Sequence, residues 1–399
     1  MNGAADTLTV TNPFSGAIVG AVPRASLDDV NRAVHHALTH LPAPPAVVRA
    51  EVLERAAQLV ATRHDELART IAAEAGKPLR QARGEVTRCV DTLIFAAVQA
   101  RSLAGAVVPM GASTAGAGKI ALTTRVPIGV IAAISPFNFP LNLVAHKVAP
   151  AIAAGCPVVL KPSEATPLSA MALGAILTEA GLPDGFLTIL NGPGETIGAA
   201  LAVHPGIAMI SFTGSAAIGW ELARQRPRIR VALELGNSTP VIVTSDADLA
   251  DAATRIAASG FTHAGQSCVS VQRVIVAATA HDRLRDLIVA RVERLVVGDP
   301  LDPATDVGPL ITTAARDRVV DWIGEARAAG ASVATGDAVR DGILLPTVLT
   351  GVTPNMRVFN DEVFGPAIGL TAFDTIDEAI DLANATRYGL QAGIFTGRV

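Results

Sequence analysis

The chain has 399 residues and a formal net charge of −4; half of its residues are hydrophobic and 17% are charged. A chain of this length and composition buries a large core, which excludes a disordered protein. The slight negative charge provides no basic face for nucleic acid or a membrane surface, so neither is expected as a partner. No apolar run of about 18 residues predicts a membrane span, and the first residues do not resemble a signal peptide. Three cysteines make no disulfide framework, so we expect a reducing, cytoplasmic location.

The first third of the chain predicts helices. Ser26, followed by two acidic residues, is typical of a helix start. Residues 48–75 carry apolar side chains at helical spacing, and residues 85–102 predict a further helix. The small residues of 110–118 indicate either a surface loop or a protruding hairpin with 119–125 as its second arm.

From residue 129 onward, short apolar runs alternate with helical segments. Such runs are typical of buried parallel strands joined by helices, so the sequence predicts an α/β fold with doubly wound sheets. The predicted strands are 130–134, 157–160, 186–190, 207–210 and 231–235, then 241–243, 269–276, 367–373 and 392–396. The predicted helices between them are 141–154, 169–180, 195–204, 216–224, a helix from 248, 282–296 and 376–384.

Polar groups follow the ends of these strands, where open parallel sheets bind ligands. Asn138 lies between two prolines that make its turn rigid. Lys161 ends a strand and either binds a ligand or extends to solvent. Ser215 either caps a helix or exposes its free N–H groups to a phosphate. Glu234 ends another strand, and carboxylates are rarely buried there without a partner or a task.

The cysteines differ in context. Cys89 and Cys156 are expected to be small buried hydrophobes, whereas Cys268 follows a Gly-Gln-Ser turn at the start of a strand. A thiol in that place is positioned for nucleophilic attack, although the context alone leaves a structural role open. Neither H-E-x-x-H nor C-x-x-C occurs, so no metal site is predicted.

Several short motifs follow one another in a fixed order: Pro136-Phe-Asn-Phe-Pro140, Lys161-Pro-Ser-Glu164, Phe212-Thr-Gly-Ser215, Glu234-Leu-Gly236, Gly265-Gln-Ser-Cys268 and Glu362-Val-Phe-Gly-Pro366. Together they resemble the NAD(P)-dependent aldehyde dehydrogenase superfamily over nearly the whole chain. The resemblance implies an NAD-binding domain over 1–106 and 127–236, an oligomerisation hairpin over 107–126, and a catalytic domain over 237–399.

The resemblance also implies catalytic roles. Cys268 would form a thiohemiacetal with the aldehyde, while Asn138 and the Cys268 N–H would stabilise the oxyanion. Glu234 would be the base that hydrolyses the resulting thioester, which favours release of a free acid over transfer to coenzyme A. Lys161 is implied to be a catalytic residue as well, and it would also bind the cofactor ribose together with Glu164.

NAD is the cofactor implied, and NADP is less expected, because the Glu164 carboxylate would repel a 2′-phosphate. The implied cofactor-binding residues are Ser135, Pro136, Phe137, Lys161, Ser163, Glu164, Gly194, Gly198, Phe212, Thr213, Gly214, Ser215, Gly219, Leu235, Gly236, Glu362 and Phe364.

The substrate implied is a short aldehyde such as lactaldehyde, and uncharged Ser267 and Phe139 disfavour an anionic one. Asn237 stands where the family has a second glycine, and we expect it to tolerate a positive φ. Family members continue past Thr396, so the sequence predicts a C-terminally shortened member without the strand that pairs with the hairpin in a homodimer or homotetramer. Two alternatives to an active enzyme remain: a truncated relative that only binds cofactor, and a thiol esterase that uses Cys268 without NAD.

Overall fold

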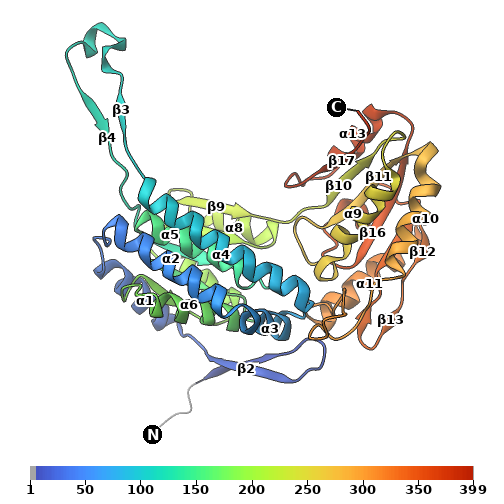
Figure 1. Cartoon of the computed structure of the whole chain (residues 1–399), viewed down its shortest axis with the longest axis horizontal. Coiled ribbons are helices and arrows are strands. Elements are labelled where there is room, and N and C mark those ends of the chain that lie inside the picture. The colour runs from blue at the N-terminus through green and yellow to red at the C-terminus, as the bar shows by residue number, and fades with distance from the viewer. Residues whose placement is uncertain (1–5, 399) are drawn as a thin grey trace.

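The structure is a computed structural model that describes residues 6–398. Two lobes are each built around one sheet, and a hairpin projects from the first lobe (Figure 1). The first sheet is parallel, with strand order β7-β6-β5-β8-β9. The second has the order β12-β15-β16-β11-β10-β17, in which only the β12–β15 pair is antiparallel. The predicted α/β fold with parallel sheets is confirmed.

Helices cover both faces of the first sheet, because alternate residues of a strand point to opposite sides. On β5, Ile131 and Ala133 pack with α2 to α6, whereas Val130 and Ala132 pack with α1 and α7. The strands are β5 (Val130–Ile134), β6 (Val158–Lys161), β7 (Leu187–Ile189), β8 (Ile207–Thr213) and β9 (Arg230–Glu234). The helices are α1 (Leu27–Thr39), α2 (Ala46–Thr62), α3 (His64–Ala75), α4 (Leu79–Ser102), α5 (Asn142–Ala154), α6 (Leu168–Glu179), the π-helical turn η3 (Gly194–Gly198), α7 (Ala199–Val203) and α8 (Ala216–Gln225).

The second lobe adds elements that the sequence did not predict. Between residues 303 and 366 the structure has α11 (Thr313–Ala328), β12 (Ser332–Thr335), a small β13–β14 hairpin (Val339–Arg340 and Ile343–Leu344), β15 (Thr347–Thr350) and α12 (Arg357–Asn360). The other elements are β10 (Thr239–Val243), α9 (Leu249–Phe261), η4 (Thr262–Gly265), β11 (Val271–Ala277), α10 (His281–Val292), β16 (Ala367–Phe373), α13 (Ile376–Asn384) and β17 (Gly393–Phe395). The buried residues of α11, Val319, Trp322, Ile323 and Ala326, recur at helical spacing, a pattern that the sequence analysis did not use.

Three local predictions need correction. The helical run over 48–75 is two helices, because Arg63 ends α2 and precedes α3. The helix over 195–204 is a π-helical turn followed by α7. β9 is not a fully buried strand: it lies at the sheet edge, its residues alternate between exposed and half-buried, and Glu234 is exposed.

The predicted start of α1 is confirmed at Ser26. The Ser26 hydroxyl accepts a hydrogen bond from the Asp29 N–H, and the Asp29 carboxylate accepts one from the Ser26 N–H. This reciprocal capping satisfies two backbone donors at the helix start.

Two antiparallel hairpins lie outside the main sheets. β3 (Ala106–Val108) pairs with β4 (Ala121–Thr123), so the hairpin alternative for this region is the correct one. This projecting hairpin exposes large apolar side chains: Val107, Ile120 and Leu122 are 73%, 86% and 68% exposed. β1 (Thr7–Thr11) and β2 (Ile18–Pro23) form the other hairpin, which the sequence did not predict. No helix within residues 6–398 is long and apolar enough to cross a membrane.

Candidate active site

The carboxyl ends of four strands of the first sheet lie in one row. Ile134 of β5 is in register with Lys161 of β6 and with Phe212 of β8. One residue further along, Thr213 is in register with Glu234 of β9. The strand order reverses at β5, and open sheets bind ligands beyond the carboxyl ends at such a switch point. The polar groups that the sequence analysis located at separate strand ends therefore share one edge.

Two donors at this edge have no acceptor. The Lys161 side chain is 5% exposed, and its ammonium forms no hydrogen bond with any residue that the structure describes. The Ser135 hydroxyl is buried and also lacks a partner among those residues. Burial lowers the pKa of Lys161, and nearby Glu164 opposes this shift. An unpaired ammonium and hydroxyl fit the ribose and phosphate oxygens of a dinucleotide.

Glycines keep space open around these donors. A Cβ on Gly194 would lie 3.8 Å from the Lys161 Nζ, and one on Gly198 would lie 3.9 Å from its Cδ, so both glycines border this side chain. Gly219, on the first turn of α8, leaves room for the Leu235 side chain, which a Cβ would meet at 2.4 Å. Ser215 caps α8 by accepting a hydrogen bond from the Ile218 N–H.

The second lobe contributes Glu362 and Phe364 to the same place. Glu362 packs against Gly236 and accepts a hydrogen bond from the Asn237 N–H at 2.9 Å. The Phe364 ring lies edge-to-face with Phe137, with centroids 5.8 Å apart. Among the predicted cofactor residues, Pro136 follows β5, Ser163 and Glu164 follow β6, and Gly214 follows β8.

Asn237 does not need the positive φ that it was expected to tolerate. The structure gives positive φ to a few non-glycine residues, and Asn237 is not among them. Its amide donates to the Thr239 hydroxyl at 2.7 Å and to the Gln391 carbonyl at 3.2 Å. The position therefore does not require glycine, and the asparagine ties β9 to β10 and to the segment before β17.

The loop that leads to Cys268 is held in a strained conformation. Three consecutive residues, His263, Ala264 and Gly265, have φ values of 51°, 54° and 72°. A Cβ on Gly265 would meet the Gly365 carbonyl oxygen at 2.0 Å, so only glycine fits there. The buried Gln266 side chain fixes the loop by donating to the His263 carbonyl and accepting from the Ile311 N–H. Left-handed non-glycine residues persist only where the surroundings impose them, and they cluster at functional sites.

Cys268 is half-buried at the end of this loop. Burial raises the pKa of its thiol, and the negative charges of Glu362 and Glu234 add to this effect. The raised pKa favours the neutral thiol over the thiolate. The Cys268 backbone N–H interacts with its own thiol, which partly offsets the rise in the pKa. It donates to no other residue of the described part of the chain.

Asn138 lies beside the nucleophile loop. Its side-chain Nδ2 donates to the Gln266 carbonyl at 2.9 Å, which orients the amide, since a carbonyl oxygen accepts only from N–H. Nδ2 retains a second hydrogen for another acceptor. The structure thus brings Asn138 and the Cys268 loop together from positions 130 residues apart.

Lys147 is a polar residue of the site that the sequence analysis missed. It is buried on α5, and its Nζ donates to the Thr213 hydroxyl at 2.7 Å. Burial lowers the pKa of Lys147 to about 8, and the charge of Glu234 opposes this shift. Lys147 lies nine residues after Asn138, within an apolar helical run, and a lysine in such a run was the signal for it.

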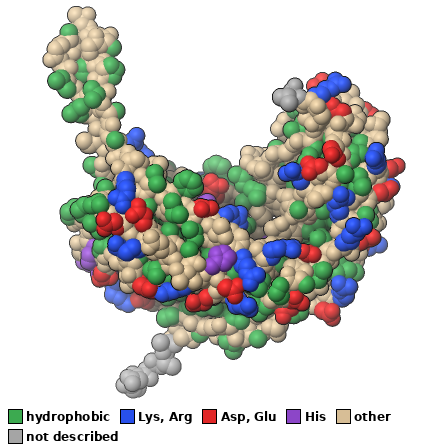
Figure 2. Space-filling model, viewed as in Figure 1, with side chains coloured by type: hydrophobic (Ala, Val, Ile, Leu, Met, Phe, Trp, Pro, Cys, Tyr) green, Lys and Arg blue, Asp and Glu red, His purple; other side chains and the backbone are tan. Residues whose placement is uncertain are grey.

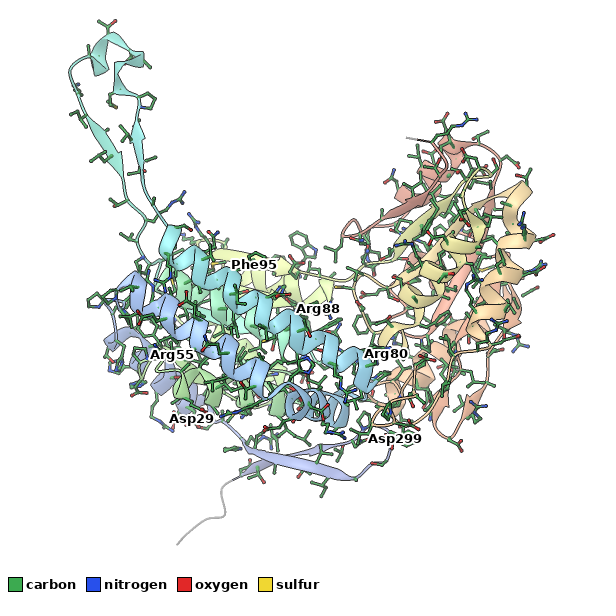
Figure 3. The ribbon with its side chains drawn as sticks, viewed as in Figure 1. Asp29, Arg55, Arg80, Arg88, Phe95 and Asp299 are labelled. Carbon is green, nitrogen blue, oxygen red and sulfur yellow. The ribbon has the colours of Figure 1, made fainter. Side chains whose placement is uncertain are left out.

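The chain neighbours of Cys268, Ser267 and Val269, line a cavity of about 160 Å³. Arg88 of α4, Phe139 and Ser267 line it, with further hydroxyls from Thr262 and Ser270. The Arg88 guanidinium lies 5.0 Å from the centre of the Phe139 ring, and no carboxylate of residues 6–398 pairs with it. Figure 3 shows Arg88 on α4. Ser267 and Phe139 are uncharged, but α4 adds a cation to the lining, so these two residues alone do not describe the charge of the cavity.

The cation that also lines this cavity, Lys77, is already neutralised. Its ammonium pairs with Glu85, and both side chains are buried. The same carboxylate accepts hydrogen bonds from the N–H groups of Leu141 and Asn142, at 3.0 and 3.1 Å. Arg88 is thus the unpaired positive charge at the cavity.

Comparison with known proteins decides the family. The model of the aldehyde dehydrogenase family matches residues 1–399. The chain belongs to this family. It is 43% identical over 396 residues to the 3-sulfolactaldehyde dehydrogenase of Priestia aryabhattai, covering 98% of this chain and 82% of that protein.

Solved aldehyde dehydrogenases share its fold. Aldehyde dehydrogenase 21 of Physcomitrella patens, in complex with the reaction product succinate, matches with a TM-score of 0.96 and 38% identity, covering 100% of this chain and 84% of that one. The NADP-dependent glyceraldehyde-3-phosphate dehydrogenase of Bacillus halodurans, complexed with NADP, matches with a TM-score of 0.95 and 37% identity, covering 98% and 83%. Membership therefore supports aldehyde oxidation with a nicotinamide cofactor.

Proposed function

We propose that this aldehyde dehydrogenase oxidises a short aldehyde to its carboxylic acid, with Cys268 as nucleophile and Glu234 as base. The observation that carries the proposal is the hydrogen bond from the Asn138 amide to the Gln266 carbonyl, in the loop that ends at Cys268, next to a small cavity that Phe139 and Ser267 help to line. A nucleophile next to two N–H donors is suited to carbonyl addition. Residues 1–106 and 127–236 would bind the cofactor, and residues 237–399 would supply the nucleophile.

The first step is the attack of Cys268 on the aldehyde carbon. Because burial and two carboxylates raise the pKa of the thiol, a base must remove its proton. Glu234 is near enough to affect that pKa and is exposed, so it can accept the proton. As the carbonyl oxygen gains negative charge, the second Nδ2 hydrogen of Asn138 and the Cys268 N–H donate to it.

The cofactor, when bound, accepts the hydride that leaves the tetrahedral carbon. Lys161 and the Ser135 hydroxyl would hold its ribose and phosphate oxygens, while Glu362 and Phe364 would border the nicotinamide end. Glu164 lies close enough to Lys161 to influence its pKa, so a carboxylate stands beside the proposed ribose site. This charge supports NAD over NADP as the cofactor. In the Glu164→Gln variant, we expect a smaller ratio of kcat/KM with NAD to kcat/KM with NADP.

Hydrolysis of the resulting Cys268 thioester needs an activated water. Glu234 would take the proton of that water, and the hydroxide would attack the thioester carbon while the Cys268 sulfur leaves. Lys147 lies within electrostatic range of Glu234 and would help to hold its charge. Both proton transfers occur at the Glu234 carboxylate, at different stages of the cycle.

We further propose that the substrate carries an anionic group. The supporting observation is the unpaired Arg88 guanidinium at the cavity beside Cys268. The matched proteins named for 3-sulfolactaldehyde, succinate and glyceraldehyde-3-phosphate involve a sulfonate, a carboxylate and a phosphate. A guanidinium binds such planar or tetrahedral oxyanions with two hydrogen bonds.

Arg88→Gln tests the substrate class. We expect the KM of succinic semialdehyde to rise about tenfold or more, since a charged hydrogen bond is lost, while the kinetics of neutral propanal stay nearly unchanged. Arg83→Gln, on the same helix but paired with Asp65, is the matched control. An equal loss for both aldehydes would contradict an anion site at Arg88.

The exposed hairpin supports self-association. Its apolar residues and Phe95 of α4, which is 71% exposed, give the first lobe an unusually apolar surface. Figure 2 shows hydrophobic side chains along the hairpin, and Figure 3 shows Phe95 on α4. We propose a homo-oligomer that forms through this surface. Ile120→Lys should lower the molecular mass that light scattering measures in solution.

Three free thiols support a cytoplasmic location.

The decisive experiment measures NADH formation by the purified chain with NAD and a panel of short aldehydes, with Cys268→Ala in parallel. NADH from the parent protein alone would support Cys268 as nucleophile. If neither protein makes NADH, an increase in melting temperature with NAD would support the cofactor-binding alternative. Ester hydrolysis by the parent protein without NAD would instead favour the thiol esterase.

A further inference from the structure

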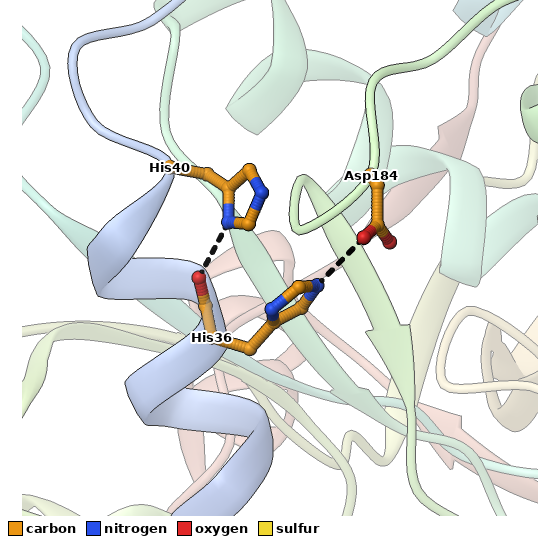
Figure 4. Close-up of side chains that lie close together, drawn as sticks. All are labelled: His36, His40 and Asp184. Atoms are coloured by element: carbon orange, nitrogen blue, oxygen red, sulfur yellow. Dashed lines mark hydrogen bonds and ion pairs between the residues drawn. The ribbon is translucent and has the colours of Figure 1, made fainter.

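A histidine pair and an aspartate meet on the first lobe, away from the candidate active site. His36 and His40 are four residues apart at the end of α1, so their rings lie on one face of the helix. Asp184 belongs to the loop that leads into β7. Figure 4 shows the three side chains together. One ligand atom from each lies within 4.8 Å of the other two.

The hydrogen bonds already favour metal binding. His40 Nδ1 lies 2.8 Å from the His36 carbonyl oxygen. Because a carbonyl only accepts, Nδ1 carries the proton and Nε2 keeps a free lone pair. A backbone carbonyl that fixes the tautomer in this way is typical of histidines that bind metals.

The second contact has the spacing of a metal site. His36 Nε2 lies 3.1 Å from Asp184 Oδ2. Two ligand atoms on a tetrahedral zinc, each about 2.0–2.1 Å from the ion, are about 3.4 Å apart. The nitrogen and oxygen are thus already close to that separation, and an ion can replace the proton between them.

The backbone holds the aspartate beside the histidines. Gly185, which follows Asp184, has a φ of 77°, and a Cβ there would meet the His40 ring at 2.4 Å. The His36 and His40 rings pack edge-to-face with centroids 4.4 Å apart. The loop and the helix end are therefore in direct contact, and Phe186 anchors the loop in the core.

We propose that His36, His40 and Asp184 form a binding site for a divalent transition metal, with zinc as the best-fitting ion. Two neutral imidazoles and one carboxylate are ligands that Zn²⁺ prefers, and water would complete the tetrahedron. Motif searches miss this site because the histidine pair lacks the H-E-x-x-H glutamate and Asp184 lies 144 residues after His40.

The position of the site indicates a structural role. Asp184 precedes β7, so the site lies at the amino edge of the first sheet, whereas the candidate active site lies at the carboxyl edge. A bound ion would tie the end of α1 to this edge strand. Binding should therefore stabilise the lobe and leave the reacting groups untouched.

The test is a calorimetric titration of the full chain with Zn²⁺, using protein without a histidine tag. A Cys268→Ala background prevents zinc from binding this half-buried thiol. We expect one tight equivalent of zinc and a higher melting temperature with the ion. His40→Ala and Asp184→Asn should each weaken binding at least about tenfold, while His35→Ala, a neighbouring exposed histidine outside the cluster, should not.

The outcomes separate the alternatives. Melting curves without metal show that the variants are folded, so weaker binding can be assigned to the lost ligand. Bound Co²⁺ can replace zinc as a coloured probe. Its visible absorption, if lost in the same two variants, would support a low-coordinate site made of nitrogen and oxygen ligands. No zinc binding by the parent chain would overturn the proposal. Binding that Asp184→Asn leaves unchanged would also overturn it, since the helical pair alone would then bind the ion.

Discussion

The candidate nucleophile and the candidate base are held in opposite ways. Cys268 ends a loop with three consecutive left-handed residues. The buried Gln266 side chain donates to the His263 carbonyl of this loop and accepts from the Ile311 N–H. Glu234 ends an edge strand, and its side chain is exposed. The first group is positioned by backbone strain that the core imposes, and the second is free to change rotamer.

This difference fits the chemistry that each would perform. A nucleophile must stay close to the one position from which it can attack the carbonyl carbon, because a misplacement of about 1 Å is costly, and a rigid loop holds it there. A base that serves the thiol first and a water later must move between two positions. Rigidity at Cys268 and freedom at Glu234 would both serve the proposed mechanism, and substitutions should affect the two regions differently.

The largest effect is expected for Gly265→Ala. The added Cβ would overlap the Gly365 carbonyl, and alanine is disfavoured at a φ of 72°. We expect a loss of about 3 kcal/mol or more in the free energy of unfolding. NADH turnover should fall by at least about a thousandfold, because the thiol and its oxyanion donor move together.

Gly342→Ala is the matched control for that substitution. Gly342 has a φ of 79° with no atom within 4 Å of an added Cβ, so it tests the backbone strain alone. Its cost should be about 1 kcal/mol, without loss of turnover. If both variants behave alike in urea unfolding and NADH assays, the close approach of Gly265 to Gly365 does not position the nucleophile.

A smaller effect, confined to turnover, is expected for Glu234→Gln. Steady-state NADH formation should fall about a hundredfold, the usual contribution of a general base, while the melting temperature stays unchanged because the side chain is exposed. Stopped-flow absorbance checks which step is slowed. Glu221→Gln, an exposed carboxylate on α8, is the control. A loss of stability in Glu234→Gln would show that the base strand is as constrained as the nucleophile loop.

The sequence predicted some of this site well and some not at all. The strand ends were predictable because parallel strands share an edge, which places Lys161, Glu234 and the turn of Asn138 together. The left-handed backbone at His263 and Ala264 was not, because positive φ is uncommon for non-glycine residues even though histidine adopts it more often than most. It arises from the tertiary contacts of Gln266.

Residues on helices were the other omission. Lys147 and Arg88 reach the site from α5 and α4, and nothing in their local sequence shows which helix face meets Cys268. That information depends on how α4 and α5 pack on β5, through contacts between segments about 50 residues apart. Asn237 taught the reverse lesson, since a departure from the family pattern proved compatible with ordinary backbone angles.

The smallest expected effect concerns the pH at which Cys268 becomes reactive. Burial and the nearby carboxylates raise the pKa of the Cys268 thiol. An unperturbed thiol has a pKa of about 8.5. The rate of alkylation by iodoacetamide should therefore reach half of its maximum at a pH above that value. Glu362→Gln removes a negative charge that opposes the thiolate and keeps an oxygen for the Asn237 N–H. The midpoint should therefore move down, by about half a pH unit.

Cys89 and Cys156 are buried and should not react in the folded chain. Glu325→Gln, far along α11, controls for the loss of charge. A midpoint already below the ordinary range would mean that the rigid loop stabilises the thiolate by itself. Glu234 would then be needed only to activate the hydrolytic water. It would have no need to move between the thiol and the water.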